Sequence, residues 1–387
     1  MRFRVVASLV VLLVIRGAAA QPPAVIPPVE PLPPPLPPFD VWLTDLRTDA
    51  EARGIRTEVL DRALTGIEPV AQILERDRAQ AEFTLTLDGY LKRRLTPATL
   101  RTARAMYKKH HALVTRVGAT FGIDPRLLVS VWGLESNFGR FAGVRPTIPT
   151  LATLAYDSRR GAMFRSELLD ALEILNRGDI ELERLKGSWA GALGQPQFMP
   201  SSYLRYAQDF DGDGRRDIWS SAPDVFASVA YYLQQRGWKK GQLWGREVII
   251  PDGAAAGLAD LPRRTEGCRA RREMSVPQPL TAWRKLGLKT VSRQPVPASA
   301  LQASLVRDDS RAFLVYDNYE ALLDYNCAHT YALSVALLAD RLTPCSLVAC
   351  ICGFSSVKSQ APHPKLHRTP KSQLPVAVKS GRWRLQG

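Results

Sequence analysis

The segment that decides the fold reads Val129-Ser130-Val131-Trp132-Gly133-Leu134-Glu135-Ser136-Asn137-Phe138-Gly139. Glu135 lies four positions after Val131 and three after Trp132, so that on a helix these side chains share one face. An apolar face removes water from a carboxyl group, which raises its pKa and lets it donate a proton near neutral pH. Glu135 is therefore a candidate general acid. The alternative is an acid at a helix end that points into solvent or caps a neighbouring group.

A second segment, Gly187 to Tyr203, reads GSWAGALGQPQFMPSSY and is rich in small residues. Small residues let the backbone approach a ligand closely. Gln197 offers both a donor and an acceptor, as amide-bearing sugars require, while Phe198 and Tyr203 offer apolar surface. The segment predicts one wall of a sugar-binding cleft, and the alternative is a tight junction between two helices.

The next segment, residues 209–217, reads DFDGDGRRD. Carboxylates at positions one, three, five and nine, with Gly at position six, match a calcium loop of the EF-hand type. Position twelve, where that pattern has a bidentate Glu, is Ser220. Calcium here would be structural, and the alternative is a solvated turn of mutually repelling acids. The expected ligands are Asp209, Asp211, Asp213, the backbone carbonyl of Arg215 and Asp224.

The rest of the pattern is mainly helical and predicts a mostly α-helical, α+β protein. Thr96 followed by Pro97, and Asp124 followed by Pro125, are typical helix starts. Residues 244–310 are richer in Pro, Gly and β-forming residues, which favours loops with short strands. The predicted helices are 39–54, 57–64, 96–121, one starting at 124 and passing Glu135, 165–176, 223–236 and 319–341.

Both ends of the chain differ from this body. Residues 1–20 have a basic start, a short apolar run and small residues at a cleavage site, which indicates a signal peptide; the alternative is an uncleaved anchor. Residues 21–38 are rich in Pro and predict an extended spacer. Residues 343–387 lack acids and helical periodicity, so they are either a disordered basic tail or the product of a shifted reading frame.

The chain has a formal net charge of +15, but much of that charge lies in the signal peptide and the tail. This distribution argues against a nucleic-acid partner, and the mild positive charge that remains on the body suits an anionic polymer without specifying which one. Of the five cysteines, Cys268 and Cys327 lie in the body. An exported protein can oxidise thiols, so these two are candidates for a disulfide.

Together these motifs resemble the lytic murein transglycosylases of the B type, a lysozyme-like family that cleaves bacterial peptidoglycan. The resemblance runs from Phe39 to Leu342 and rests on four motifs that occur in order along the chain. They are Glu135-Ser136-Asn137-Phe138-Gly139, Ala152-Thr153-Leu154-Ala155-Tyr156-Asp157-Ser158-Arg159-Arg160, the segment 187–203 with the acidic loop after it, and Tyr325-Asn326 with Tyr331.

The resemblance implies a lysozyme-like catalytic core with an accessory helical segment, and a role for several residues. Glu135 matches the acid/base of the family, and the acidic loop matches its metal site. Arg159 and Arg160 match a basic pair that meets peptide or lactyl carboxylates; their alternative is surface ion pairs. The other residues expected along the substrate cleft are Ser188, Gln197, Tyr90, Tyr325, Asn326 and Tyr331.

The implied reaction breaks the β-1,4 bond between N-acetylmuramic acid and N-acetylglucosamine with Glu135 alone, first as acid and then as base. The sugar's own 6-hydroxyl attacks, which leaves a 1,6-anhydro end and needs no catalytic cofactor. One rival is a muramidase that uses water and a second carboxylate, for which Asp157 is a candidate. The other rival is a wall-binding protein without activity.

The resemblance and the signal peptide together imply a monomer exported to the periplasm of a Gram-negative cell, with no stable membrane span. Its expected partners are peptidoglycan glycan strands and enzymes of cell-wall synthesis.

Overall fold

The computed structural model describes residues 36–79, 86–157, 160–254, 257–258, 260–308 and 310–342. The predicted signal peptide, most of the predicted spacer, the predicted tail and Arg159 lie outside the described residues. Among the residues that are described, no helix is both long and apolar enough to cross a membrane. The structure therefore shows almost all of the predicted catalytic region.

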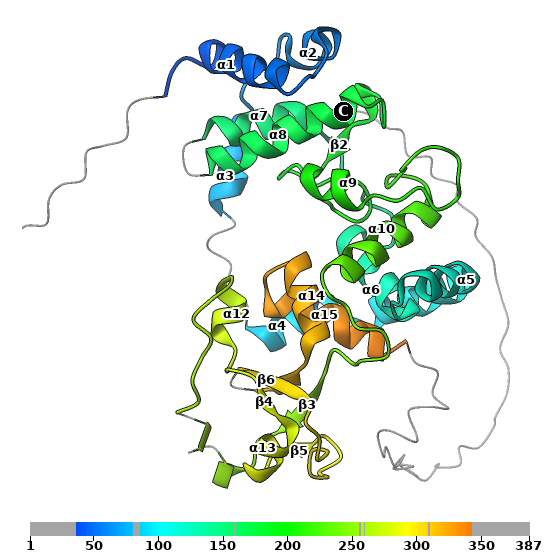
Figure 1. The fold of residues 1–387 in the computed structure, drawn as a ribbon, viewed down its shortest axis with the longest axis vertical. Helices are drawn as coiled ribbons and strands as arrows, with labels where there is room; N and C mark the ends of the chain where they lie inside the picture. The colour runs from blue at the N-terminus through cyan, green and yellow to red at the C-terminus, as the bar shows by residue number, and fades with distance from the viewer. Residues whose placement is uncertain are drawn as a thin grey trace, which may run out of the picture.

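Most of this region is helical, as predicted, and a small sheet lies at one end of the molecule while α1, α2, α7 and α8 lie at the other (Figure 1). The helix α7 was not predicted because it is buried nearly all round and lacks a one-sided apolar pattern. The helices are α1 (Phe39–Ala52), α2 (Thr57–Leu64), α3 (Ala71–Ala79), α4 (Leu87–Arg94), α5 (Pro97–Phe121), α6 (Pro125–Ser136), α7 (Thr147–Tyr156), α8 (Gly161–Asn176), α9 (Pro200–Tyr206), α10 (Ala222–Gln235), α12 (Arg269–Glu273), α13 (Leu280–Lys285), α14 (Asp317–Tyr325) and α15 (His329–Asp340).

The predicted starts of the two central helices are confirmed. The Thr96 side chain accepts a hydrogen bond from the Thr99 amide at 3.1 Å, and Pro97 occupies the first turn of α5. The Asp124 side chain caps α6 by accepting from the Arg126 amide at 2.9 Å. These caps satisfy amide groups that a helix start leaves without a backbone partner.

The helix α6 lies at the centre of the catalytic region and packs against α5, α10 and α15. Its residues from Leu127 to Leu134 are all buried, so the helix is enclosed on nearly every side. In its last turn Glu135 is partly exposed, while the residues on either side of it are buried. The surrounding helices therefore fix the position of that turn.

The predicted helix over 319–341 is wrong in one respect, because the structure divides it into α14 and α15. Asn326 at the break has extended backbone angles, with φ −151° and ψ 116°. Its amide still bonds to the Leu322 carbonyl at 3.1 Å, and its carbonyl accepts from the Ala328 amide at 2.7 Å. The break lets the chain change direction between Tyr325 and Tyr331.

The sheet confirms the prediction of short strands in residues 244–310 and continues just beyond that range. Its five strands are antiparallel and lie in the order β4-β6-β7-β3-β5. A separate apolar core beneath it centres on the fully buried Trp283, whose indole donates to the Ala303 carbonyl at 3.0 Å. The strands of this sheet are β3 (Gly245–Ile249), β4 (Gln278–Pro279), β5 (Lys289–Thr290), β6 (Gln302–Arg307) and β7 (Ala312–Val315).

The short helix α12 is fastened to α14 and α15 by a disulfide and by ion pairs. Cys268 and Cys327 form the predicted disulfide, with their Cα atoms 6.4 Å apart. Arg271 of α12 pairs with Glu320 at 2.6 Å and with Asp324 at 3.0 Å, both on α14. These contacts hold α12 against α14 and against the break between α14 and α15.

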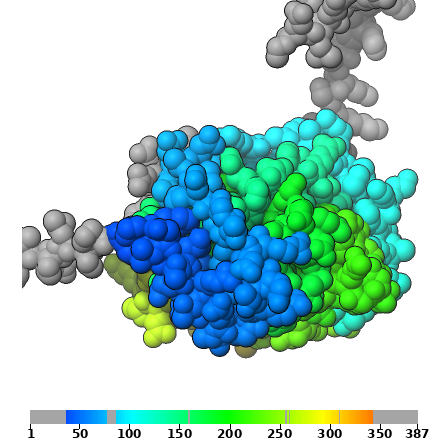
Figure 2. Space-filling model, turned by 90° about the horizontal axis from the view of Figure 1, so that it is seen from above, coloured from blue at the N-terminus to red at the C-terminus, as the bar shows by residue number. Residues whose placement is uncertain are grey.

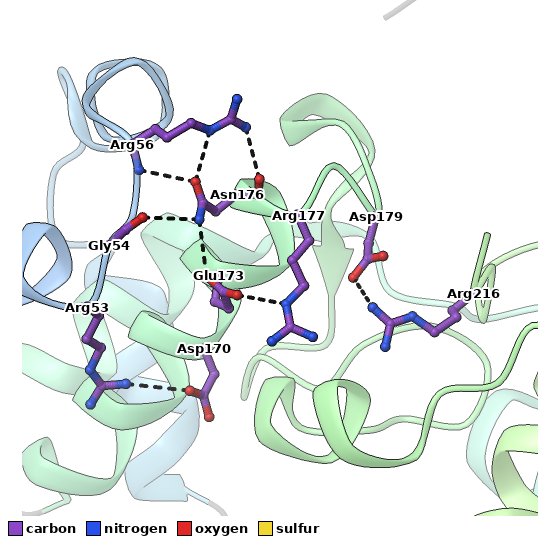
Figure 3. A network of polar contacts seen from close by, with 9 residues as sticks. All are labelled: Arg53, Gly54, Arg56, Asp170, Glu173, Asn176, Arg177, Asp179 and Arg216. Atoms are coloured by element: carbon purple, nitrogen blue, oxygen red, sulfur yellow. Dashed lines mark hydrogen bonds and ion pairs between the residues drawn. The ribbon is translucent and has the colours of Figure 1, made fainter. Parts of the chain in front are cut away.

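The N-terminal helices α1 and α2 cover one end of the molecule (Figure 2). Figure 3 shows how the α1–α2 junction is held on α8: the Arg56 guanidinium donates to the Asn176 side chain at 3.1 Å and to its carbonyl at 2.9 Å. Arg53 pairs with Asp170 at 3.6 Å. In the same view Arg216 pairs with Asp179 at 2.6 Å, which anchors the acidic loop near the end of α8.

Candidate active site

The turn that follows Glu135 is tightly constrained. Asn137, Phe138 and Gly139 all have left-handed backbone angles, with φ of 49°, 59° and 79°. The Ser136 hydroxyl accepts a hydrogen bond from the Gly139 amide at 3.0 Å and so closes the turn. Non-glycine residues in this conformation carry strain and are enriched at functional sites. The turn ends α6 immediately after Glu135, which places that carboxyl at the edge of the core.

The Glu135 carboxyl is partly accessible, yet its apolar surroundings take it largely out of water. Burial raises the pKa of Glu135 to about 7, while the neighbouring Tyr331 hydroxyl and the Arg94 cation act in the opposite direction. A carboxyl with a raised pKa can hold its proton near neutral pH. The expected apolar setting of this carboxyl is confirmed, and the group is suited to proton donation.

The break between α14 and α15 brings Tyr325 and Tyr331 to Glu135. Their rings are stacked with centroids 6.2 Å apart, and the charge of Glu135 raises the pKa of both after the larger effect of burial. The Tyr325 hydroxyl donates to the Pro196 carbonyl at 2.7 Å. The Tyr331 hydroxyl is buried next to Glu135 but does not reach hydrogen-bond geometry with any described group. Asn326 between them is exposed.

Tyr90 joins the same site from α4. Its ring influences the pKa of Tyr331 and lies 6.0 Å from the Arg94 guanidinium. Sequence positions 90, 135, 325 and 331 are thus brought together by packing of α15 against α4, α6 and α14. Their roles toward a substrate stay a prediction.

The segment 187–203 forms a compact turn beside this group. The Ser188 hydroxyl accepts from the Ala192 amide at 3.1 Å, and Gln197 has a left-handed φ of 54° with its side-chain amide donating to the Gly194 carbonyl at 2.7 Å. Both side chains are partly exposed. Phe198 and Tyr203, in contrast, are buried in the core, so the prediction that they offer surface to a ligand is wrong.

A buried glutamine that sequence reasoning missed connects this segment to α6. The Gln195 side chain accepts from the Trp132 indole at 2.6 Å and donates to the Trp219 carbonyl at 2.7 Å. A Cβ on Gly139 would lie 2.7 Å from the Gln195 oxygen, so only glycine fits there. Gln195 therefore fixes the wall against the Glu135 turn. The one signal for Gln195 in the sequence is its position two residues before Gln197, in the same segment.

Arg94 is a second residue that sequence reasoning missed. It is the last residue of α4, and its guanidinium donates to the Leu134 carbonyl at 2.6 Å. Nothing in its local sequence, a run of basic residues, distinguishes it from a solvated surface cation.

The predicted basic pair is described only in part. Arg160 is exposed at the start of α8, and its guanidinium lies 5.0 Å from the Phe164 ring. Asp157, the candidate second carboxylate, follows α7 and is not among the groups that shift the pKa of Glu135.

The acidic loop gathers three of its predicted ligands. The carboxylate oxygens of Asp209, Asp211 and Asp213 all lie within 4.8 Å of one another, and all three residues are exposed. Asp209 also accepts from the Gly212 and Gly214 amides at 2.7 and 2.9 Å, which shapes the loop around it. An oxygen cluster of this kind has the donor chemistry that calcium prefers.

The other two predicted ligands, Asp224 and Arg215, are not part of this carboxylate cluster. Asp224 is fully buried and outside the cluster, and its two oxygens accept from the Phe210 and Asp217 amides at 2.8 and 2.9 Å. It therefore organises the loop from beneath, a role that only the tertiary structure reveals. The Arg215 amide donates to Asp213 at 2.8 Å, which keeps that residue in the loop next to the cluster.

Residues 38–340 match the protein family described as the transglycosylase SLT domain. The chain belongs to this family. The resemblance inferred from the four motifs is thereby confirmed, as is the mostly helical, lysozyme-like fold with small sheets.

Individual members of the transglycosylase SLT family resemble this chain closely. It is 30% identical over 258 residues to membrane-bound lytic murein transglycosylase B of Escherichia coli strain K12. The match covers 65% of this chain and 66% of that protein, so it spans just under two thirds of the relative's length. It is 41% identical to SltB3 from Pseudomonas aeruginosa in complex with NAG-anhNAM-pentapeptide, with a TM-score of 0.71 over 79% of each chain. The Escherichia coli lytic transglycosylase Slt35 in complex with calcium is 26% identical, with a TM-score of 0.65 over 79% of this chain and 92% of that one.

Proposed function

We propose that this SLT-family protein is a peptidoglycan lytic transglycosylase that cleaves the bond between N-acetylmuramic acid and N-acetylglucosamine and leaves 1,6-anhydro ends. The observation that carries the proposal is the setting of Glu135. Burial raises the pKa of this carboxyl to about 7, and no second carboxylate is among the described groups that shift it in either direction. A hydrolytic glycosidase of the usual kind needs two carboxylates.

The mechanism follows from a single group that can hold or release a proton. Protonated Glu135 donates to the bridging oxygen as the glycosidic bond breaks, while the N-acetyl group of the muramic acid assists at the anomeric carbon. The resulting carboxylate then accepts the proton of the 6-hydroxyl as that oxygen attacks the same carbon. Attack within one sugar avoids the entropy cost of positioning an external water. Tyr90, Tyr325, Asn326, Tyr331, Ser188 and Gln197 would line the glycan.

The products of sacculus digestion test this reaction. Purified mature protein should release muropeptides with 1,6-anhydro ends, each one water lighter by mass spectrometry than the reducing-end product. The control is a muramidase digest of the same sacculi. Reducing ends from this protein would instead assign it to hydrolysis, and binding without release would assign it to the wall-binding proteins.

The proposed site of action is the periplasm of a Gram-negative cell, where this substrate lies. The predicted signal peptide and the relatives named above support this location. Arg159 and Arg160 would meet carboxylates of the substrate, and we propose that the protein acts as a monomer with wall-synthesis enzymes as partners.

We also propose that the acidic loop binds a structural calcium ion through Asp209, Asp211 and Asp213, with the Arg215 carbonyl next to them. Three carboxylates within 4.8 Å repel one another unless a cation is present. The calcium complex of Slt35 supports the proposal by similarity. The ion would hold the loop that Asp224 and Arg216 attach to the body, and it would take no part in proton transfer.

Calcium should therefore raise the thermal unfolding temperature, and a chelator should reverse the effect. A ligand at one hundred times its Kd adds about 2.7 kcal/mol of stability. Asp211→Asn should abolish the calcium-dependent rise, whereas Asp252→Asn, which changes an exposed acid elsewhere, should leave it intact. An equal response of both variants, or a wild-type unfolding temperature that ignores calcium, would contradict the metal site.

A further inference from the structure

Arg94 ties α4 to the last turn of α6. Its guanidinium donates to the Leu134 carbonyl at 2.6 Å, and that carbonyl belongs to the peptide bond that leads into Glu135. The last four carbonyls of a helix have no partner within it, and the helix end carries partial negative charge. A cation at this place satisfies one carbonyl and fixes the peptide that carries the proposed acid.

Arg94 forms no ion pair with another described residue, and its Nε atom is buried without a hydrogen bond. The side chain as a whole is partly exposed, so water screens its charge less than that of a cation on the open surface. The charge lies beside the peptide bond that leads into Glu135, where it stabilises a carboxylate that forms nearby.

The other titratable groups that face Glu135 remain neutral. They are the hydroxyls of Tyr331 and Tyr325, whose pKa values burial raises well above the usual range. Tyr90 lies beside Tyr331. His110 packs on Trp132, and burial lowers its pKa. Arg94 is thus the cation that acts on Glu135 within the described part of the chain.

We propose that Arg94 is a positioning residue of the transglycosylase reaction, the counter-ion of the Glu135 carboxylate that exists between proton donation and proton return. This inference rests on the proposed function. When Glu135 gives its proton to the bridging oxygen, the new negative charge lies next to the guanidinium. When the 6-hydroxyl returns a proton, Glu135 becomes neutral again.

Two substitutions separate the charge of Arg94 from its hydrogen bond. Arg94→Gln keeps an amide donor for the Leu134 carbonyl and removes the charge, whereas Arg94→Lys keeps the charge and loses the planar fork. Arg93→Gln is the matched control, since Arg93 is the exposed neighbour on the same helix turn. Thermal unfolding of each variant checks that the fold is retained.

The readout is the pH profile of kcat/KM on sacculi. The wild-type rate should fall as the pH rises through about 7, because Glu135 must start protonated. In Arg94→Gln the midpoint should move to higher pH and kcat should fall about tenfold, since the carboxylate has lost its counter-ion. Arg94→Lys should keep the wild-type midpoint, and Arg93→Gln should behave as the wild type. A folded Arg94→Gln with reduced rate and an unmoved midpoint would overturn the proposal.

A second measurement keeps this inference separate from the proposed function. Carbon-13 NMR of labelled glutamate carboxyls can follow the Glu135 titration without turnover, with Glu135→Gln used to assign the signal. A higher Glu135 pKa in Arg94→Gln than in the wild type supports the counter-ion role even if the products prove hydrolytic. An unchanged Glu135 pKa overturns it even if the products carry 1,6-anhydro ends.

Discussion

Replacement of Glu135 by Gln should lower the turnover of isolated sacculi by about 10³-fold or more. General acid–base catalysis by one side chain contributes typically 10² to 10⁴, and here one carboxyl serves both proton transfers. The amide has the same shape but can neither donate an acidic proton nor accept one from the 6-hydroxyl. The measurement is the initial rate of muropeptide release, followed by mass spectrometry.

The variant should remain folded and keep most of its affinity for a peptide-bearing disaccharide, because the change removes no packing. Glu266→Gln is the matched control, since Glu266 is exposed and lies outside the site. Wild-type rates from a purified, folded Glu135→Gln would show that another group is the acid.

Removal of the disulfide should have the second large effect, this time on stability. Cys268 and Cys327 close a loop across 59 positions of sequence. In the chain-entropy description, a cross-link over this separation stabilises the fold by about 4 kcal/mol. The double variant Cys268→Ser with Cys327→Ser should therefore unfold at distinctly lower denaturant concentration, with a steeper slope because its unfolded chain is less compact.

The same variant should also raise KM more than it lowers kcat, because Cys327 directly follows Asn326 at the proposed cleft while Glu135 is held by other helices. The control is the wild type treated with a dithiol, which should reproduce the loss, whereas the double variant should not respond further. An unfolding midpoint equal to that of the oxidised wild type would show that the ion pairs of Arg271 suffice to hold α12.

The sequence by itself determined the local features of this protein. Helix starts at Thr96 and Asp124 follow from side chains that bond to their own neighbours, and the structure has both. The spacing of Val131, Trp132 and Glu135 predicted a carboxyl at an apolar face, because the helix period relates these positions without help from the rest of the chain. The order of four motifs identified the family.

The role of a residue within a motif was predictable where its sequence neighbours determine that role. It was less predictable where tertiary packing determines it. Phe198 and Tyr203 lie in a segment that has both buried and partly exposed residues, so their apolar character alone could not tell which of the two they would be. Asp224 carries a carboxylate, as a calcium ligand would, yet in the structure both of its oxygens accept hydrogen bonds from backbone amides. The continuous helical pattern of 319–341 concealed the break at Asn326.

Only the tertiary structure decided how the proposed site is composed. Arg94 and Glu135 are separated by forty residues, and Tyr331 is far beyond both, so no local periodicity relates them. Packing of α15 against both α6 and α4 brings them together. The pKa of Glu135 depends on that packing. It is set by the burial of this carboxyl on α6, by the Tyr331 hydroxyl on α15 and by the Arg94 cation on α4. The sequence decides which side chains each helix carries. The fold decides which charged groups come close to one another, and electrostatic interactions depend on that distance in space.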